Sequence, residues 1–224
     1  MRRTRETDAK AVSAFHTEGE AEEWILTKGD ISFIPDNADT GLIFYPGAKV
    51  EHTAYIPFMR LISSEDVACV IFNMPFHLAL FRTHAADTVR AAFPEIQHWY
   101  IAGHSLGGVV ASMEVKKHPG VYDGLILLGA YANEDISDSS ARVLLIRGSD
   151  DRVLNTEKYE LAKANLPPDS KEIVLEGGCH AYFGMYGMQK GDGTPKITNE
   201  EQIRITAKTV ADWIGTGGTD AENP

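Results

Sequence analysis

The chain has 224 residues, of which 43% are hydrophobic and 24% charged, as is typical of a single soluble globular domain. Its formal net charge of −11 at pH 7 disfavours nucleic acids and other phosphate-rich partners, because these bind surfaces with clustered lysines and arginines. With no apolar run of about 18 residues and only two cysteines, the sequence predicts a cytoplasmic protein without a membrane span, a disulfide framework or a CxxC metal site.

The first 20 residues are polar and carry no periodic pattern, so we expect a loose arm over residues 1–20. Their basic start, "MRRTR", resembles the first part of a signal peptide, but acidic residues follow where an apolar segment would be required. Next, "EEWILTKGDISFIPD" predicts two short strands around a turn at residues 28–30. Without an internal repeat or a break in composition, we expect one domain over residues 21–215 and a loose tail over residues 216–224.

Beyond the turn, short apolar runs alternate with helical patterns. The runs are "GLIFYPG", "VACVIFNMP", "HWYIAGHS", "GLILLGA", "VLLIRGSD" and "KEIVLEGG". Each lacks clean polar alternation, which is typical of strands covered on both faces. The helical patterns cover about His52–Ser63, about Arg82–Ala92, the segment from Leu106 to "KHPG", "NTEKYELAKANL" and Thr198–Gly215. This order predicts an α/β fold with a mostly parallel central sheet of about eight strands and helices on both faces.

The pentapeptide "GHSLG" lies where an apolar strand gives way to a helical pattern. Alone, it would also fit a glycine-rich turn without chemistry. A nucleophile elbow requires this strand–turn–helix setting, because the sharp turn lifts a serine hydroxyl above the edge of the sheet. Gly103 and Gly107 supply the small residues that such a turn needs on either side of Ser105. We therefore predict Ser105 as a nucleophile.

A serine hydroxyl needs a base that takes its proton and an acid that orients the base. His180 follows the last predicted strand and is the only histidine downstream of "RVLLIRGSDD". Two aspartates in that segment compete for the role of the acid. The pattern G-x-x-D-x-V favours Asp151, and we assign Asp150 to a turn or a helix cap. The predicted catalytic residues are thus Ser105, Asp151 and His180, in the chain order of an α/β-hydrolase triad.

An oxyanion hole for such a nucleophile takes two backbone N–H groups. One belongs to the residue after the serine, here Leu106. The other lies in the loop after an early strand, a position that "YPGAKV" occupies. We predict the amides of Ala48 and Leu106 as the donors, with Gly47 as the alternative to Ala48.

On these residues the chain resembles the α/β-hydrolase superfamily over residues 24–214. More narrowly, "TGLIFYPGAKVE", "NMPFHLALF", "AGHSLGG" and "EGGCHAYFGMYGMQKGDG" resemble a compact group of dienelactone-hydrolase-like and esterase-like proteins of largely unassigned function. The resemblance implies the same triad. Members often have Asn where this chain has Cys179, and many carry an N-terminal membrane anchor, which we do not carry over to this chain.

Only the short stretch "YANEDISDSSAR" separates "GLILLGA" from "VLLIRG", where many α/β hydrolases insert a helical cap. We therefore expect no cap domain and a relatively open site. The stretch "HAYFGMYGMQKGDG" either lines an acyl pocket or covers the strand ends as core, and Phe76 and His77 could reach the same crevice. We expect His104 to be a packed neighbour of the site and Cys179 to be a buried support rather than a reactive thiol.

Together these features predict a cofactor-free carboxylesterase that acts on small ester-like substrates through an acyl-enzyme. Thioester, lactone, amide or carbon–carbon hydrolysis on the same triad is the alternative, and a hydrolase-like scaffold used only for binding is the third reading. No metal site is expected, because the remaining histidines lack paired carboxylates and HExxH spacing. The absence of GxxxxGK[ST] disfavours nucleotide binding.

Overall fold

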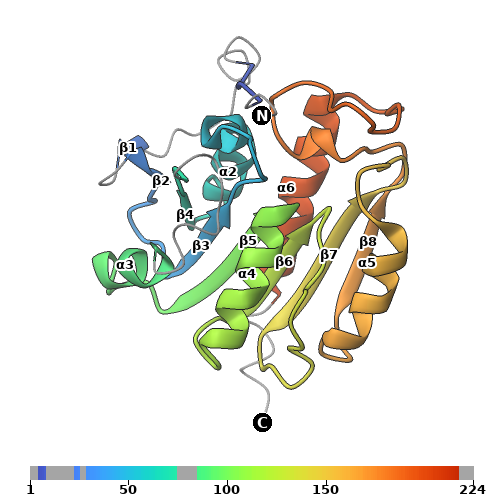
Figure 1. Cartoon of the computed structure of the whole chain (residues 1–224). Helices are drawn as coiled ribbons and strands as arrows, with labels where there is room; N and C mark the ends of the chain where they lie inside the picture. Colours follow the sequence, from blue (N-terminus) through green and yellow to red (C-terminus); the bar gives the residue numbers. More distant parts are fainter. Residues whose placement is uncertain (1–4, 9–22, 26–28, 75–84, 217–224) are drawn as a thin grey trace.

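An eight-stranded sheet runs through the middle of the molecule in the order β1-β2-β4-β3-β5-β6-β7-β8 (Figure 1). The computed structural model describes residues 5–8, 23–25, 29–74 and 85–216. The strands are β1 (Glu23–Ile25), β2 (Ile31–Phe33), β3 (Thr40–Tyr45), β4 (Val67–Ile71), β5 (His98–His104), β6 (Gly124–Leu128), β7 (Arg142–Gly148) and β8 (Lys171–Leu175). Strands β3 to β8 are parallel, and β1 and β2 form an antiparallel edge. The predicted mostly parallel sheet and the pairing of its first two strands are therefore confirmed.

The inner strands are buried on both faces, which explains why their sequences are apolar without alternation. In β3, Leu42 and Phe44 face one core, whereas Ile43 and Tyr45 face the other. All four side chains have no exposed surface. The sheet therefore separates two hydrophobic layers, each of which must be covered by helices.

Helices cover both faces of the sheet (Figure 1). They are α2 (Ile56–Ser63), α3 (Ala85–Ala92), α4 (Leu106–Lys117), α5 (Thr156–Ala162) and α6 (Asn199–Gly215), with the short 3-10 helices η2 (His52–Tyr55), η5 (Lys163–Asn165) and η6 (Ala181–Phe183). Helices α2 and α6 pack into the layer of Phe44, and α3, α4 and α5 pack into the layer of Tyr45. In the described part of the chain, no helix is both long and apolar enough to cross a membrane.

Helix boundaries follow local signals in the sequence. Thr198 forms a capping box with Glu201 at the start of α6, and Asn155 caps α5 by accepting the Lys158 N–H at 2.8 Å. The helix predicted from His52 differs at its first turn, which is a 3-10 helix. Pro57 near the start of α2 has no N–H, so the α-helical bond to the residue four positions earlier cannot form there.

Turns alone connect β6 to β7 across residues 129–141, all of which are described. No helical insertion rises from this connection, where a cap domain would start. The prediction of a cap-less fold is therefore confirmed, and the carboxyl ends of the strands are bordered by loops.

One buried carboxylate, away from the carboxyl ends of the strands, makes the stability of the folded protein depend on pH. Glu114 on α4 has a side chain that is only 2% exposed, and its Oε2 lies 3.6 Å from His118 Nε2. Burial raises the pKa of Glu114 from 4.5 to about 6, against the attraction of Lys117 and with a smaller contribution from Asp87. The folded state therefore favours the protonated form, so the contribution of Glu114 to stability is fully present below about pH 4.5 and is lost as the pH rises through about 6.

We expect Glu114→Gln to stabilise the protein at pH 8 and to change it little at pH 4, since the amide resembles the protonated carboxyl. The gain at pH 8 should be about 1–2 kcal/mol. Urea unfolding at both pH values measures it, with exposed Glu160→Gln as the control. An equal effect of Glu114→Gln at the two pH values would contradict the assignment.

Candidate active site

Ser105 occupies a strained turn between β5 and α4. Its backbone angles, φ 53° and ψ −121°, lie in a region that non-glycine residues rarely adopt. The Ser105 N–H donates to the carbonyl of Leu128 on the neighbouring strand β6 at 2.9 Å, which holds the turn against the sheet. Strain of this kind costs about 1–3 kcal/mol and is maintained where the surrounding structure requires it.

The glycines around Ser105 are required by close packing. A Cβ on Gly103 would overlap the backbone of Gly107, and a Cβ on Gly107 would overlap the carbonyl of Tyr45 at the end of β3. Gly108 is equally restricted, because its Cβ would lie 2.5 Å from the Ala130 Cβ. Sequence reasoning identified the first two positions and missed the third. The elbow therefore packs directly against the strand end that leads into the "YPGAKV" loop.

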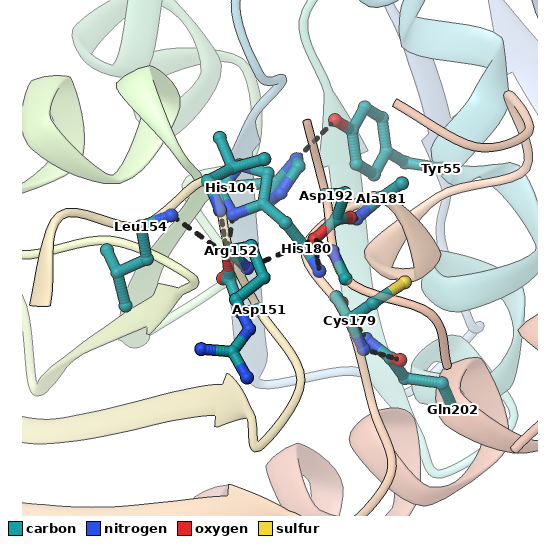
Figure 2. A network of polar contacts seen from close by, with 12 residues as sticks. Tyr55, His104, Asp151, Arg152, Leu154, Cys179, His180, Ala181, Asp192 and Gln202 are labelled. Carbon is teal, nitrogen blue, oxygen red and sulfur yellow. Dashed lines mark hydrogen bonds and ion pairs between the residues drawn. The ribbon is translucent and has the colours of Figure 1, made fainter. Parts of the chain in front are cut away.

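His180 and Asp151 form a buried pair at the carboxyl ends of β8 and β7 (Figure 2). His180 Nδ1 lies 2.8 Å from Asp151 Oδ2, and the two side chains are 2% and 1% exposed. The other carboxylate oxygen of Asp151 accepts the N–H groups of Val153 at 2.9 Å and Leu154 at 2.8 Å. These bonds hold the carboxylate in one orientation, in which its second oxygen accepts the Nδ1–H of the His180 ring.

Asp150 takes no part in this pair. Its Oδ2 accepts a hydrogen bond from Ser149 Oγ at 3.3 Å and lies 3.7 Å from Lys196 Nζ. Of the two competing aspartates, the structure thus brings Asp151 to the histidine and directs Asp150 toward the surface.

Gly129 connects the elbow to the buried pair. It directly follows Leu128, whose carbonyl accepts the Ser105 N–H, and a Cβ on Gly129 would lie 3.0 Å from His180 Nδ1 and 3.3 Å from Asp151 Oδ2. The three predicted residues therefore gather at one edge of the sheet. Within the described ranges, no hydrogen bond joins Ser105 Oγ to His180. Bonds of this kind often tighten only when substrate binds.

Two polar side chains that sequence reasoning missed hold the backbone around His180. Asp192 accepts the N–H of Ala181 at 2.7 Å and that of His180 at 3.3 Å. The Gln202 amide on α6 pairs with both the N–H and the carbonyl of Cys179, at 2.9 and 2.8 Å. The tight turn "KGDG" was the available signal for Asp192, whereas the buried Gln202 had none.

Cys179 is buried, and burial is the main cause that raises the pKa of its thiol to about 12. The thiol is therefore protonated at neutral pH and a poor nucleophile. This agrees with the predicted supporting role.

His104, next to Ser105, belongs to a second buried network. The Gly47 N–H donates to Tyr55 Oη at 3.1 Å, and Tyr55 Oη shares a hydrogen bond of 2.8 Å with His104 Nδ1 (Figure 2). The ring centroids of His104 and His180 are 4.6 Å apart. Burial, followed by the nearby His180, lowers the pKa of His104 well below its ordinary value, so the ring is neutral. As predicted, His104 is a packed neighbour of the site.

The same network distinguishes the two candidate N–H donors of the "YPGAKV" loop, Gly47 and Ala48. The Gly47 N–H is engaged by Tyr55, which leaves it unable to face an oxyanion. The amides of Ala48 and Leu106 have no acceptor among the residues that the structure describes. This difference favours Ala48 over Gly47 as the partner of Leu106.

The aromatic stretch after His180 lies mainly in the core. Phe183, Met185 and Tyr186 are buried, and the Phe183 and Tyr186 rings lie 5.5 and 6.4 Å from the His104 ring. Met188 is 50% exposed. These contacts favour the reading that the stretch covers the strand ends. Phe76 and His77 lie outside the described residues.

We expect Tyr55→Phe to lower kcat about tenfold. The change leaves the Gly47 N–H and His104 Nδ1 buried without a partner, and it removes the hydrogen bond that holds Gly47, the residue before Ala48. Steady-state kinetics per titrated active site measures the effect. Tyr159→Phe is the matched control: it removes a buried hydroxyl bonded to Glu172 at 2.9 Å, near the start of β8 and away from this edge. It should reduce stability but not kcat. Equal kcat values for the two variants would contradict the role of Tyr55.

A family model described as "Alpha/beta hydrolase family" matches residues 41–204. Among solved structures, a dienelactone hydrolase from Anabaena variabilis is similar with a TM-score of 0.65 and 13% identity, covering 88% of this chain and 99% of that one. Est1E from Butyrivibrio proteoclasticus has a TM-score of 0.64 and 15% identity, over 90% and 100% of the two chains. A predicted CIB-like hydrolase from Thermoplasma acidophilum has a TM-score of 0.59 and 18% identity, over 85% and 98%. No curated protein matches the chain significantly.

Proposed function

The chain belongs to the alpha/beta hydrolase family, and from its site we propose that it is a serine hydrolase that cleaves carboxylic esters. The observation that carries this proposal is the buried His180–Asp151 pair, at the sheet edge where Ser105 occupies the strained elbow. A bound carboxylate that orients a histidine beside a serine hydroxyl is the arrangement that acyl transfer requires.

In the proposed reaction, His180 Nε2 takes the proton of Ser105 Oγ while Oγ attacks the carbonyl carbon of the ester. The carbonyl π electrons move to its oxygen, which the Ala48 and Leu106 N–H groups stabilise. The bond to the leaving alcohol then breaks, and His180 returns the proton to that alcohol. A water molecule, deprotonated by His180, attacks the acyl-enzyme, and the released Ser105 Oγ recovers the proton.

The electrostatics around His180 support this role. During attack the ring becomes an imidazolium, and the Asp151 carboxylate at 2.8 Å stabilises the new charge. The His104 ring is 4.6 Å away and neutral, because burial lowers its pKa well below the ordinary value. A second cation at that distance would oppose proton transfer to His180. Of these two neighbours of His180, Asp151 therefore stabilises the charged ring, and the neutral His104 does not repel it.

The short β6–β7 connection supports a substrate that is small or extended rather than deeply enclosed. Among the described residues, turns and not a cap follow the carboxyl end of β6. Solved proteins of similar fold include Est1E, carboxylesterases from Nitrososphaera gargenis and a monoacylglycerol lipase from Paleococcus ferrophilus. We propose small carboxylic esters as the substrate class.

A series of p-nitrophenyl esters of increasing acyl length tests the proposal, with thioester and lactone panels measured in parallel. We expect fastest turnover on short acyl esters, with a burst of p-nitrophenol that reports formation of the acyl-enzyme. Preference for a thioester or lactone would assign the triad to that bond instead. A folded protein that turns over no activated ester would contradict an enzymatic role.

A further inference from the structure

The segment Arg5–Asp8 lies outside the part of the chain that matches the family, yet it is attached to the loop that holds Ala48. The Arg5 N–H donates to the carbonyl of Lys49 at 2.6 Å, and the Arg5 carbonyl accepts the N–H of Glu51 at 3.2 Å. The Arg5 guanidinium adds a hydrogen bond from Nη1 to the carbonyl of Ala48 at 3.2 Å. Arg5, in the arm that we expected to be loose, therefore has defined partners.

Further contacts, made by Thr7 and Asp8, extend this attachment beyond Arg5. The Thr7 N–H donates to the Glu51 carboxylate at 2.7 Å, and the hydroxyls of Thr7 and Thr53 lie 2.6 Å apart. The Asp8 N–H donates to the carbonyl of Met185 at 2.8 Å. The segment thus joins the loop after β3 to the loop that follows His180.

The loop after β3 is held by one internal bond, from the Val50 N–H to the carbonyl of Gly47 at 3.2 Å, and by such outside contacts. Residues 46–51 contain no helix and no regular strand, and Lys49 has a left-handed φ of 62°. Tyr55 holds the Gly47 N–H on one side of Ala48, and Arg5 holds the Ala48 carbonyl on the other. The Ala48 N–H lies between these two anchors, in the peptide whose carbonyl accepts the Val50 N–H, so Tyr55 and Arg5 hold the peptides on either side of it. A hydrogen bond from a guanidinium is stronger than one between neutral groups.

We propose that Arg5 is a positioning residue of the active site, which orients the Ala48 N–H toward the oxyanion by holding the Ala48 carbonyl. The inference rests on the proposed function. Arg5 acts through the loop and not on the substrate. The segment Arg5–Asp8 is thereby an N-terminal addition to the hydrolase domain that completes its oxyanion hole.

The test compares Arg5→Ala with wild type in the full chain. We expect kcat per titrated active site to fall about tenfold with little change in KM, because the donor is displaced but not removed. Affinity for a trifluoromethyl ketone, whose adduct with Ser105 carries an oxyanion, should fall by a similar factor. Arg5→Lys keeps the cation and should recover part of the loss. Arg204→Ala, which removes an exposed ion pair with Glu200, is the control and should leave both values unchanged.

Active-site titration with a fluorophosphonate counts reactive sites, so a lower folded fraction cannot imitate a lower kcat per site. Thr7→Pro provides a second variant, since it removes the N–H bonded to Glu51 and leaves the guanidinium in place. It should lower kcat in the same direction. Wild-type kcat in both variants, with wild type labelled and active, would overturn this inference alone. A wild type that neither reacts with the fluorophosphonate nor hydrolyses esters would overturn the proposed function and this inference together.

Discussion

Ser105→Ala is expected to lower kcat on an activated ester by about 10⁴- to 10⁶-fold while the protein stays folded. The alanine has no oxygen to form the acyl-enzyme, so the remaining rate comes only from water attack assisted by the oxyanion donors. Substrate binding should change little, because the hydroxyl contributes mainly in the transition state. Single-turnover kinetics separates the two effects, since it measures acylation independently of product release.

Ser112→Ala is the matched control for this variant. Ser112 lies on the same helix as the elbow, and its hydroxyl donates to the carbonyl of Val109 at 2.7 Å. Its loss should reduce stability slightly and leave kcat unchanged. Comparable activity of Ser105→Ala and Ser112→Ala would rule out Ser105 as the nucleophile.

Asp151→Asn is expected to lower kcat by about 10³- to 10⁴-fold. Two N–H groups, from Val153 and Leu154, already bond to one oxygen of Asp151. In the variant, the amide oxygen of the asparagine must take the side that accepts these two N–H groups. Its NH₂ group therefore faces His180 Nδ1. His180 then accepts at Nδ1 and carries its proton on Nε2, where it cannot take the proton of Ser105.

The control for this change is Asp150→Asn, which makes the same substitution at the adjacent residue. Asp150 contacts Ser149 and Lys196 and does not contact His180. We expect kcat within about twofold of wild type, because the pair of Asp150 with the exposed Lys196 is long, at 3.7 Å, and such a pair contributes little. Comparing kcat/KM of Asp151→Asn with kcat/KM of Asp150→Asn tests which aspartate acts as the acid of the triad. Similar losses for both would contradict it.

Much of the fold could be predicted because its signals are local. The apolar runs of β3 to β7 are buried on both faces, and Thr198 and Asn155 cap α6 and α5 at the starts of the predicted helical patterns. The elbow was also readable, since the requirement for glycine at positions 103 and 107 follows from how closely a strand, a turn and a helix pack there. The choice of Asp151 over Asp150 rested on a short pattern, and the contact with His180 agrees with it.

The supporting contacts of the site could not be predicted because they join residues far apart in the chain. Tyr55 and His104 are separated by 49 positions, and Gln202 and Cys179 by 23. No periodic pattern marks such a pair, and a buried tyrosine reads as core in the sequence. The attachment of Arg5 to the loop at Ala48, 43 positions away, was missed for the same reason: a short polar arm looks loose unless its partners are known.

The central claim is that Ser105 is activated for attack by His180 and Asp151. Reaction with a fluorophosphonate, followed by intact-mass measurement and peptide mapping, tests it most directly, because this reagent labels only an activated serine at a useful rate. We predict one adduct per chain, located on Ser105, absent from Ser105→Ala and strongly slowed in Asp151→Asn. No adduct on the folded wild type, or an undiminished adduct on Ser105→Ala, would contradict the claim.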